Sequence, residues 1–395
     1  MKQKCLFIVS AFIIGATTIF GANNTSKSVL DKMDVVAVQT KVGNSTVISC
    51  NINSLKETIE IPLNEFVESL HIVKLDKRDE ALVDGSNTTV TDNYILVRNK
   101  KQNPYKLFDK KGKFITTIGS YGQGPGEYMN VYDDFLDEKN KRIYILPWQT
   151  DKLLVYDLTG KALTPIPLPY RVPKGVFSVN SAKSTISVAL LPFAGMPSVA
   201  WSQDFKGNIL GSVKSGNLSV KPDFSNEVNS GNNTSGFDFS LFTFFELRPD
   251  TVYHYNGGNQ LTPKFTLDFK KKPIKIHWYE ELPNHFIGNV TVEVQLSDNL
   301  STTEKPAKFI VDKRTLKGAF YTIYNNFLGN MPIDWATFQN GYYVWNVEPG
   351  ALMDLLSKQL KDKKISEKQR QNMTKILSGI DENDNNYIVY GKLKK

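Results

Sequence analysis

The sequence predicts an all-β fold, a six-bladed β-propeller with a small helical insertion in its last blade. Three observations predict it. A tight turn recurs about every 50 residues, each turn joins two β-prone runs, and a further β-prone run precedes each of these hairpins. The 395 residues include 17 Tyr and 23 Phe. Both residue types favour strands, because planar side chains fit a pleated, half-buried surface.

The recurring turn has an Asp followed three residues later by a Gly. The Asp side chain caps the turn, and Gly supplies the positive φ that closes it. Three copies are clear and two are looser, with Asn256 or Asp312 in the Asp position. Repeats of this kind, with several strands each, are typical of propeller blades. The clear copies pair Asp109 with Gly112, Asp157 with Gly160 and Asp204 with Gly207.

An apolar run lies before each hairpin, and we interpret these six runs as the inner strands of the blades. The sixth hairpin then needs the C-terminal run 387–393, which the insertion 350–380 separates from its partner. The insertion has helical periodicity and predicts two helices, with a capping box at Ser366 and Gln369. The six runs are Tyr94–Arg98, Arg142–Leu146, Thr185–Leu190, Leu241–Leu247, Val290–Leu296 and Tyr342–Val347.

Closure of the ring needs a strand from one end of the chain to complete a sheet begun at the other, because open edges would otherwise remain. The candidates are residues 58–61 and 71–75, and we expect one or both to pair with the C-terminal strand. We therefore assign residues 57–395 to the propeller and residues 23–56 to a loosely ordered lead-in segment.

Residues 1–22 have the charge and length of a signal peptide. Lys2 and Lys4 precede an apolar run that is short for a membrane span. Of the two cysteines, only Cys50 lies beyond this segment, so an internal disulfide cannot form in the exported chain. We expect an exported monomer, either periplasmic or at the cell surface or secreted, with no transmembrane span in the mature chain.

Composition argues against several functions. The formal net charge is +8, but the positive charges are spread out, and the densest cluster, at 358–370, falls on a predicted helix. A solvated helix face explains that cluster better than a nucleic-acid site. The chain has four His and no HExxH, CxxC, GxSxG or Walker motif. We expect no nucleic acid, no cofactor and no metal, and no residue is assigned a catalytic role.

The segment GSYGQGPGEY (119–128) is the most distinctive in the chain. Its spacing differs from that of a phosphate-binding loop, and the Lys of such a loop is missing. Strands lie on both sides, so we interpret the segment as a structural connection between blades that brings backbone close to backbone. The residues that would enforce its turn are Gly119, Gly122, Gly124, Pro125 and Gly126.

The stretch from Phe114 to Lys161, with its hairpin, Gly-rich loop and following strands, resembles an NHL-type propeller repeat. Residues 57–394 as a whole are similar to a family of exported bacterial six-bladed β-propellers of unassigned function, loosely related to TolB-like propellers. The resemblance implies the fold and export, and it implies no particular activity. The lipoprotein Cys that is common near the start of such proteins is absent. The matching segments are IPLNEF (61–66), GQGPGEY (122–128), DTVYHYNGGNQLTPKFTLDF (250–269) and ENDNNYIVYGKLK (382–394).

Two classes of function stay open. A non-catalytic binding or scaffold protein would use the channel face to hold a glycan, a peptide or a protein partner, and we favour this class. Arg98, Trp148 and Arg248, at the predicted inner-strand ends, would supply stacking and charge-assisted hydrogen bonds to an anionic glycan or peptide fragment. The alternative is a lactonase-like hydrolase with a metal ion in the channel. Its oxygen ligands would come from Glu246, Glu293 and Asn346.

Overall fold

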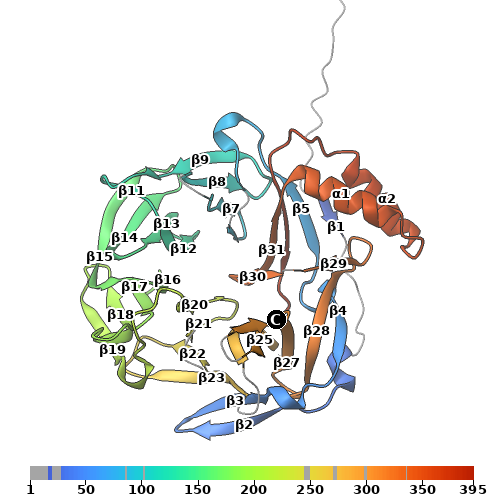
Figure 1. Cartoon of the computed structure of the whole chain (residues 1–395). Helices are drawn as coiled ribbons and strands as arrows, with labels where there is room; N and C mark the ends of the chain where they lie inside the picture. Colours follow the sequence, from blue (N-terminus) through green and yellow to red (C-terminus); the bar gives the residue numbers. More distant parts are fainter. Residues whose placement is uncertain are drawn as a thin grey trace, which may run out of the picture.

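Six β-sheets surround a central channel in the computed structural model (Figure 1). The prediction of a six-bladed β-propeller is therefore confirmed. We number the blades 1 to 6 in chain order from residue 88. The structure describes residues 17–19, 28–84, 87–100, 103–243, 250–269, 274–297, 300–334 and 336–395.

Blades 1 to 3 are four-stranded antiparallel sheets in which the first strand of each lies next to the channel. Two short strands, β10 (Ser120–Tyr121) and β11 (Glu127–Tyr128), pair within the Gly-rich segment between blades 1 and 2. From the channel outward, the strands are β6 (Thr88–Val90), β7 (Tyr94–Val97), β8 (Tyr105–Asp109) and β9 (Phe114–Ile118) in blade 1, β12 (Val131–Asp137), β13 (Arg142–Pro147), β14 (Thr150–Asp157) and β15 (Ala162–Val172) in blade 2, and β16 (Gly175–Asn180), β17 (Thr185–Leu190), β18 (Ser198–Asp204) and β19 (Ile209–Lys214) in blade 3.

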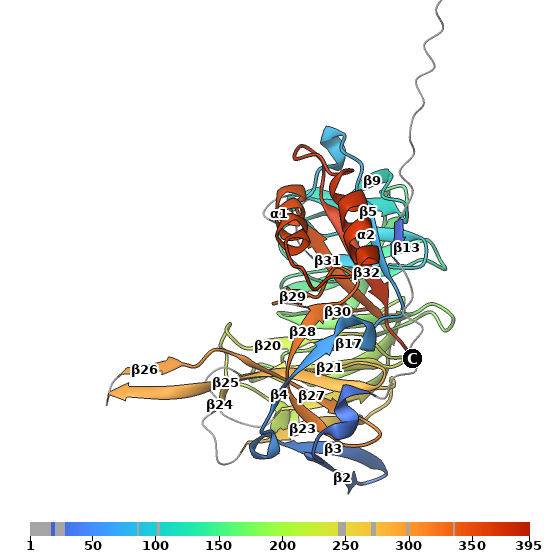
Figure 2. The ribbon, with the colours of Figure 1, turned by 90° about the vertical axis from the view of Figure 1, so that its right-hand side faces the viewer.

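Blades 4 to 6 carry additions to this plan. In blade 5 the second strand continues past the sheet and pairs with β26 (Leu300–Thr303) as a projecting arm (Figure 2). From the channel outward, the strands are β20 (Glu227–Asn229), β21 (Phe237–Phe242), β22 (Thr251–Tyr255) and β23 (Leu261–Asp268) in blade 4, β24 (Ile274–Glu281), β25 (His285–Ser297), β27 (Ala307–Asp312), β28 (Gly318–Asn325) and β29 (Met331–Ile333) in blade 5, and β30 (Thr337–Gln339), β31 (Tyr342–Val347) and β32 (Tyr387–Lys392) in blade 6.

The N-terminal segment lies along the outer edges of three blades. The strand β5 (Leu70–Lys74) pairs antiparallel with β32, with Ile72 opposite Val389, and so supplies the fourth strand of blade 6. This pairing confirms the prediction that at least one of the two candidate segments pairs with the C-terminal strand. The other, β4 (Thr58–Pro62), pairs parallel with β28 of blade 5 instead. Outside β5 lies β1 (Thr17–Ile19).

Much of the expected lead-in segment is folded onto blade 4. The strands β2 (Ala37–Val42) and β3 (Ser45–Asn51) form a hairpin, and β3 pairs parallel with β23. Cys50 is buried there and faces Leu267 in register. A sequence pattern for a lone hairpin looks the same whether the hairpin is free or added to an existing sheet edge. Addition to the edge covers backbone groups that would otherwise template pairing with another chain.

The insertion in blade 6 forms the two expected helices, α1 (Pro349–Leu360) and α2 (Glu367–Leu377). The capping box is present, with Ser366 and Gln369 each bonding the other's backbone N–H. Leu352, Leu356 and Met373 are buried against the outer parts of blades 5 and 6. The helices therefore cover the sheet edge beside the closing strands, as Figure 1 shows on the right.

The Asp-to-Gly turns serve two purposes at once. Asp109 Oδ1 accepts hydrogen bonds from the backbone N–H groups of Lys111 and Lys113, which closes the turn. Gly112 has φ +85°, and a Cβ added there would lie 2.1 Å from the carbonyl oxygen of Lys74 in the neighbouring blade. The recurring Gly is therefore required by the turn and also by the close approach of two blades.

One part of the strand assignment was wrong. The runs taken as inner strands are the second strands of their blades, because another strand lies between each of them and the channel. The inner strands are β6, β12, β16, β20, β24 and β30, and three of them have only three residues. Strands that are very short or contain several polar residues show no clear apolar–polar alternation. The hydrophobic pattern therefore identified the next strand outward as the inner strand. In blade 4 the run Leu241–Leu247 overlaps the end of β21, and the rest of that run lies outside the described residues.

Candidate functional site

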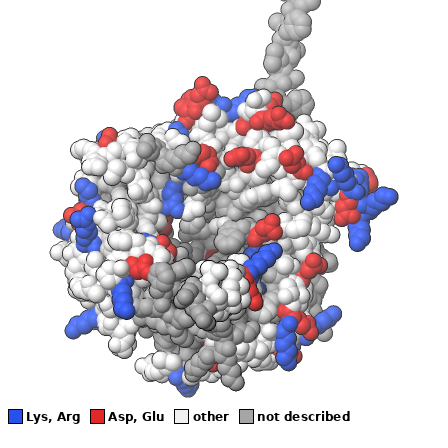
Figure 3. All heavy atoms as spheres, in the orientation of Figure 1, with Lys and Arg blue, Asp and Glu red and all other residues white. Residues whose placement is uncertain are grey.

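The inner strands of blades 2 to 6, with Asn87 and Arg98 of blade 1, line one cavity of about 690 Å³ at the end of the channel where the inner strands begin. We call it the central cavity. It opens on the face shown in Figure 3, which is hollowed near its centre, and the arm of blade 5 projects from the same face (Figure 2). Because every blade supplies lining residues, the ring itself fixes the shape of the cavity.

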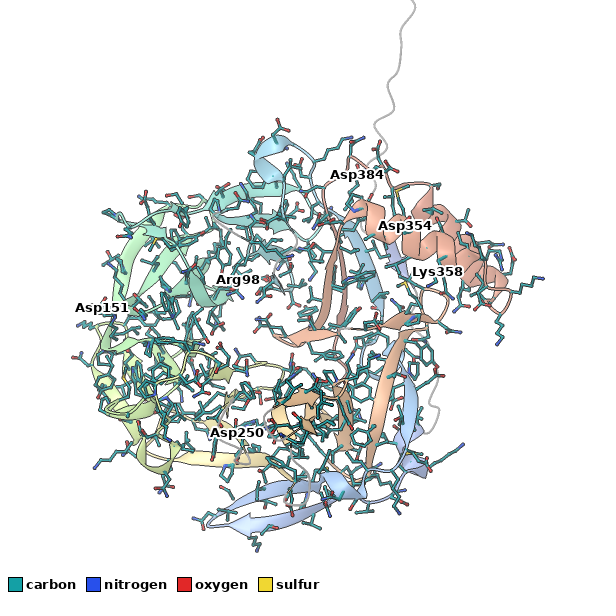
Figure 4. All side chains as sticks on the ribbon, viewed as in Figure 1. Arg98, Asp151, Asp250, Asp354, Lys358 and Asp384 are labelled. Atoms are coloured by element: carbon teal, nitrogen blue, oxygen red, sulfur yellow. The ribbon has the colours of Figure 1, made fainter. Side chains whose placement is uncertain are left out.

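One wall of the central cavity is built around Arg98 at the end of β7. Figure 4 shows this side chain beside the channel. Its Nη1 donates to the carbonyl oxygens of Tyr132, at 3.2 Å, and of Val131, at 3.5 Å. Arg98 therefore fixes the start of β12 to blade 1. The guanidinium lies among the lining residues of the cavity, where its remaining N–H groups can serve a ligand.

Two adjacent carboxylates follow on β12. Asp134 accepts from Tyr105 Oη at 3.0 Å and from Thr89 Oγ1 at 3.2 Å. Asp133 accepts from the backbone N–H of Phe177 at 2.9 Å. Burial, and then the charge of Asp134, raise the pKa of Asp133 to about 7. At neutral pH the Asp133 carboxyl can therefore donate or accept a hydrogen bond.

Next to these lies a cluster from blades 2, 3 and 4. Glu227 of β20 accepts from Tyr132 Oη and from Lys174 Nζ. Lys174 is buried and also donates to the carbonyl oxygens of Phe224, at 2.7 Å, and Asn226, at 2.8 Å. The cation is thus held by three acceptors. The cluster locks the segment before β20 against blade 3.

The opposite wall, from blades 5 and 6, is less polar. Ile276 and Trp278 of β24 and Phe338 of β30 line it. His277 stacks on Tyr279 with ring centroids 5.5 Å apart. Burial lowers the pKa of His277 to about 4, so the ring is neutral at neutral pH. Within the described part of the chain, neither ring nitrogen of His277 has a hydrogen-bond partner.

The loop between β20 and β21 crosses the channel below this cavity. Asn233 donates from Nδ2 to Glu280 Oε1 at 2.6 Å and to the carbonyl oxygen of Phe338 at 3.2 Å. Its Oδ1 accepts from the backbone N–H of Gly341 at 3.0 Å. Burial and the nearby Asp238 raise the pKa of Glu280 well above its usual range. The loop therefore connects blade 4 to blades 5 and 6 and forms a floor.

Beyond this floor is a second cavity of about 1380 Å³, which opens on the opposite face. We call it the far-side cavity. Several of its charged groups are paired. Glu281 accepts from His254 Nε2, and Lys313 Nζ donates to Glu281 Oε1 at 2.5 Å. Asp92 accepts from Tyr342 Oη at 2.8 Å.

A third cavity, of about 790 Å³, lies over blade 2 on the same face as the central cavity. We call it the rim pocket. The Gly-rich segment forms one side, and the turn between β13 and β14, with Trp148, forms the other. Trp148 is 41% exposed. Its backbone N–H donates to the carbonyl oxygen of Asn130, 2.8 Å away, immediately before β12.

Of the three residues expected at the site, the structure places Arg98 and Trp148 in different cavities. Arg98 lines the central cavity, Trp148 lines the rim pocket, and Arg248 lies outside the described residues. Of the oxygen ligands considered for a hydrolase, Asn346 donates to Thr88 Oγ1, and Glu293 lies on the strand that forms the arm. Glu246 also lies outside the described residues. In the described ranges, no cluster of three or more His, Cys, Asp or Glu could hold a metal ion.

Sequence reasoning missed most of the lining residues. Asp133, Asp134 and Glu227 stand on inner strands that were not recognised. Two adjacent carboxylates within VYDDFLD resemble a solvated edge, although Asp134 is buried. Trp278, within β24, was not among the expected site residues either. The useful signal would have been an acidic pair inside an otherwise apolar run.

The Gly-rich segment contains three glycines with positive φ. Gly119 and Gly126 have φ of +65° and +74°, and Gly122 has φ +157°. Gly124 is not among the residues with positive φ. A Cβ on Gly119 would lie 2.6 Å from the ring of Tyr128, and Gly126 accepts from Tyr156 Oη at 3.0 Å. Pro125 lies within the same turn and lines the rim pocket.

Comparison with known proteins gives the family. Residues 45–392 match the family model described as "Domain of unknown function (DUF4934)", so the chain belongs to that family. No curated protein matches. A "Putative exported protein" from Bacteroides fragilis NCTC 9343 is similar in structure, with TM-score 0.56, 17% identity and coverage of 86% of this chain and 100% of its own. A DUF4221 family member from Bacteroides vulgatus matches with TM-score 0.39 and 12% identity, over 83% and 97% of the two chains.

In the described residues, the helices are too short or too polar to cross a membrane.

Proposed function

We propose that this protein is an exported, non-catalytic glycan-binding protein that holds one or two sugar units in its central cavity. One observation carries the proposal. Most of the charged and hydrogen-bonding groups that line the cavity come from blades 1 to 4, and blade 5 adds the half-buried ring of Trp278 on the opposite wall. Sugars present hydroxyl groups at their edges and C–H faces that pack on aromatic rings, so both walls have a counterpart in the ligand.

The charges favour a neutral glycan over the anionic ligand that the sequence suggested. Among the described lining residues, the acidic groups outnumber the cations, because Arg98 stands alone. The carboxylate of an anionic sugar would have only the Arg98 guanidinium as a charged partner among these residues, and any lining carboxyl group that ionises would repel it. A hydroxyl group can instead donate to a carboxylate and accept from a guanidinium. The acidic lining residues are Asp133, Asp134, Glu227, Asp238 and Glu280.

Export is part of the proposal. It rests on the signal-like residues 1–22 and on the structural similarity to a protein described as exported. The site would then meet glycans outside the cytoplasm, and periplasm and cell surface both fit. The relation of the Gly-rich segment to NHL-type repeats and the wider relation to TolB-like propellers stay predictions.

Isothermal titration of the mature chain with malto-, cello- and chito-oligosaccharides, beside anionic oligogalacturonides, tests the proposal. We expect a neutral disaccharide to bind and the anionic one to bind at least about tenfold more weakly, since a lost or repelled charge contact is worth about 1–2 kcal/mol. Trp278→Ala should weaken disaccharide binding about tenfold or more. Trp148→Ala is the matched control, because Trp148 lies in the rim pocket, and it should leave disaccharide affinity unchanged.

Two results would contradict the proposal. One is the absence of binding across the neutral panel. The other is equal loss of affinity in both Trp variants. Release of reducing ends during incubation would instead support the hydrolase alternative.

A further inference from the structure

The rim pocket holds an exposed tryptophan in a fixed position. Gln149, the residue after Trp148, has φ +53°, a left-handed conformation that is uncommon for residues other than Gly. Arg171 Nε donates to the carbonyl oxygen of Gln149 at 3.0 Å, and Trp148 N–H is bonded to Asn130. The backbone therefore presents the indole to solvent, although burial of a Trp side chain would be favourable.

The other side of the rim pocket is also preformed. The carboxylate of Glu127 accepts from the backbone N–H of Gly124 at 2.9 Å, which ties the Gly-rich segment to itself. Tyr128 Oη donates to the carbonyl oxygen of Ile118 at 2.5 Å, and Tyr156 bonds Gly126. Neither side needs to reorganise before a ligand binds, so little binding energy is spent on ordering the protein.

A second exposed aromatic connects this pocket to the central cavity. Phe224 is 56% exposed and meets Trp148 edge to face, with ring centroids 6.3 Å apart. The carbonyl oxygen of Phe224 accepts from Lys174, and Lys174 is bonded to Glu227 in the wall of the central cavity. A path of contacts therefore runs from Glu227 through Lys174 and Phe224 to Trp148.

From this path we infer that the ligand is an extended neutral glycan chain. One end would lie in the central cavity, and the following sugar units would pass over Phe224 and reach Trp148 in the rim pocket. This inference rests on the proposed function of the central cavity and names the form of its ligand.

Charge in the rim pocket agrees with a neutral chain. Two cations and two anions line it, so no net charge selects an ionic ligand. The Trp148 and Phe224 rings lie side by side and are exposed, which suits packing against the face of a sugar unit. The charged residues are Lys152, Arg171, Glu127 and Asp151.

Affinity as a function of chain length tests the inference. The neutral oligosaccharide type that binds in the panel would be titrated at two, four and six units into the wild-type mature chain. We expect affinity to rise about tenfold from two units to six, since each added stacking contact contributes about 0.5–1.5 kcal/mol. Trp148→Ala and Phe224→Ala should each remove most of this gain and leave disaccharide affinity unchanged.

Tyr121→Ala is the matched control, because Tyr121 is 42% exposed near the same loop but does not line the rim pocket. It should keep the gain with length. Disaccharide binding without any gain would overturn the extended-chain inference and leave the proposed function intact, as would a gain that survives in both aromatic variants. Binding of an unfolded apolar peptide, used as a comparator, in place of every sugar would overturn both.

Discussion

The pKa values of buried carboxyl groups are shifted in opposite directions at the two ends of the channel. At the central cavity, Asp133 and Glu280 carry carboxyl groups whose pKa values burial raises. At the far-side cavity, burial alone would raise the pKa of Glu281, but its hydrogen bond from His254 and the charge of Lys313 outweigh burial and lower it. These two carboxyl groups of the central cavity therefore have raised pKa values, whereas Glu281 of the far-side cavity is paired with His254 and Lys313.

This difference indicates which end binds and which end stabilises. Groups held in a cavity without full ionic compensation are costly to the fold, and such costs concentrate at functional sites. Paired groups are satisfied within the protein and have less to offer a ligand. The floor formed by Asn233 and its loop keeps the two environments apart.

The largest effect is expected from removing the shared anion of the far-side cavity. Glu281→Gln leaves Lys313 and His254 without their carboxylate, and the loss of one partner from a buried pair costs about 3 kcal/mol. Urea denaturation at pH 7 would measure the free energy of unfolding. The exposed Glu382→Gln serves as control and should change it little. A Glu281 variant as stable as the control would show that the far-side pairing does not stabilise the fold.

A smaller effect is expected at the floor between the two cavities. Asn233→Ala removes two donated bonds and one accepted bond, and it leaves the carbonyl oxygen of Phe338 and the N–H of Gly341 without this partner. Unsatisfied buried polar groups cost about 1–3 kcal/mol. The exposed Asn256→Ala is the control for urea denaturation. If Asn233→Ala matched that control, the floor would be incidental to stability.

How much of this arrangement the sequence could predict depends on the range of the interactions. The Asp109 turn is local, because Asp and Gly specify it within four residues, and the blade count followed from its repetition. The capping box at Ser366 is local too. Closure by β5 was predictable in kind, because a ring must cover its edges.

The site was harder, because the distance of a strand from the channel axis is not a local property. The run at Tyr94 looked like an inner strand until β6 was found between it and the channel. Arg98 lines the central cavity because it directly follows β7 on the face where this cavity opens. Trp148 shares that face but lies farther from the axis, in the rim pocket. Only the packing of the blades distinguishes these two positions.

A last effect is expected in the pH dependence of stability, and it has opposite sign at the two ends. The ordinary pKa of Asp133 is 3.8, and in the folded protein it is about 7. Between these values the folded state binds the proton more tightly, so the free energy of unfolding falls as pH rises from about 4 to 7. For Glu281, with its lowered pKa, stability is present above the ordinary value of 4.5 and is lost as pH falls below it.

Asp133→Asn should therefore flatten the fall between pH 4 and 7, because the amide keeps an acceptor for the N–H of Phe177 and cannot ionise. Denaturation midpoints measured from pH 3 to 8 should show that the stability of Asp133→Asn, relative to the wild type, increases as pH rises. Glu281→Gln should flatten only the acid side, below about pH 4.5. The exposed Asp151→Asn should follow the wild-type curve throughout. If the Asp133 variant also followed the wild-type curve, the Asp133 carboxyl would be ionised in both the folded and the unfolded state near neutral pH. The pKa of this carboxyl group would then not distinguish the central cavity from the far-side cavity.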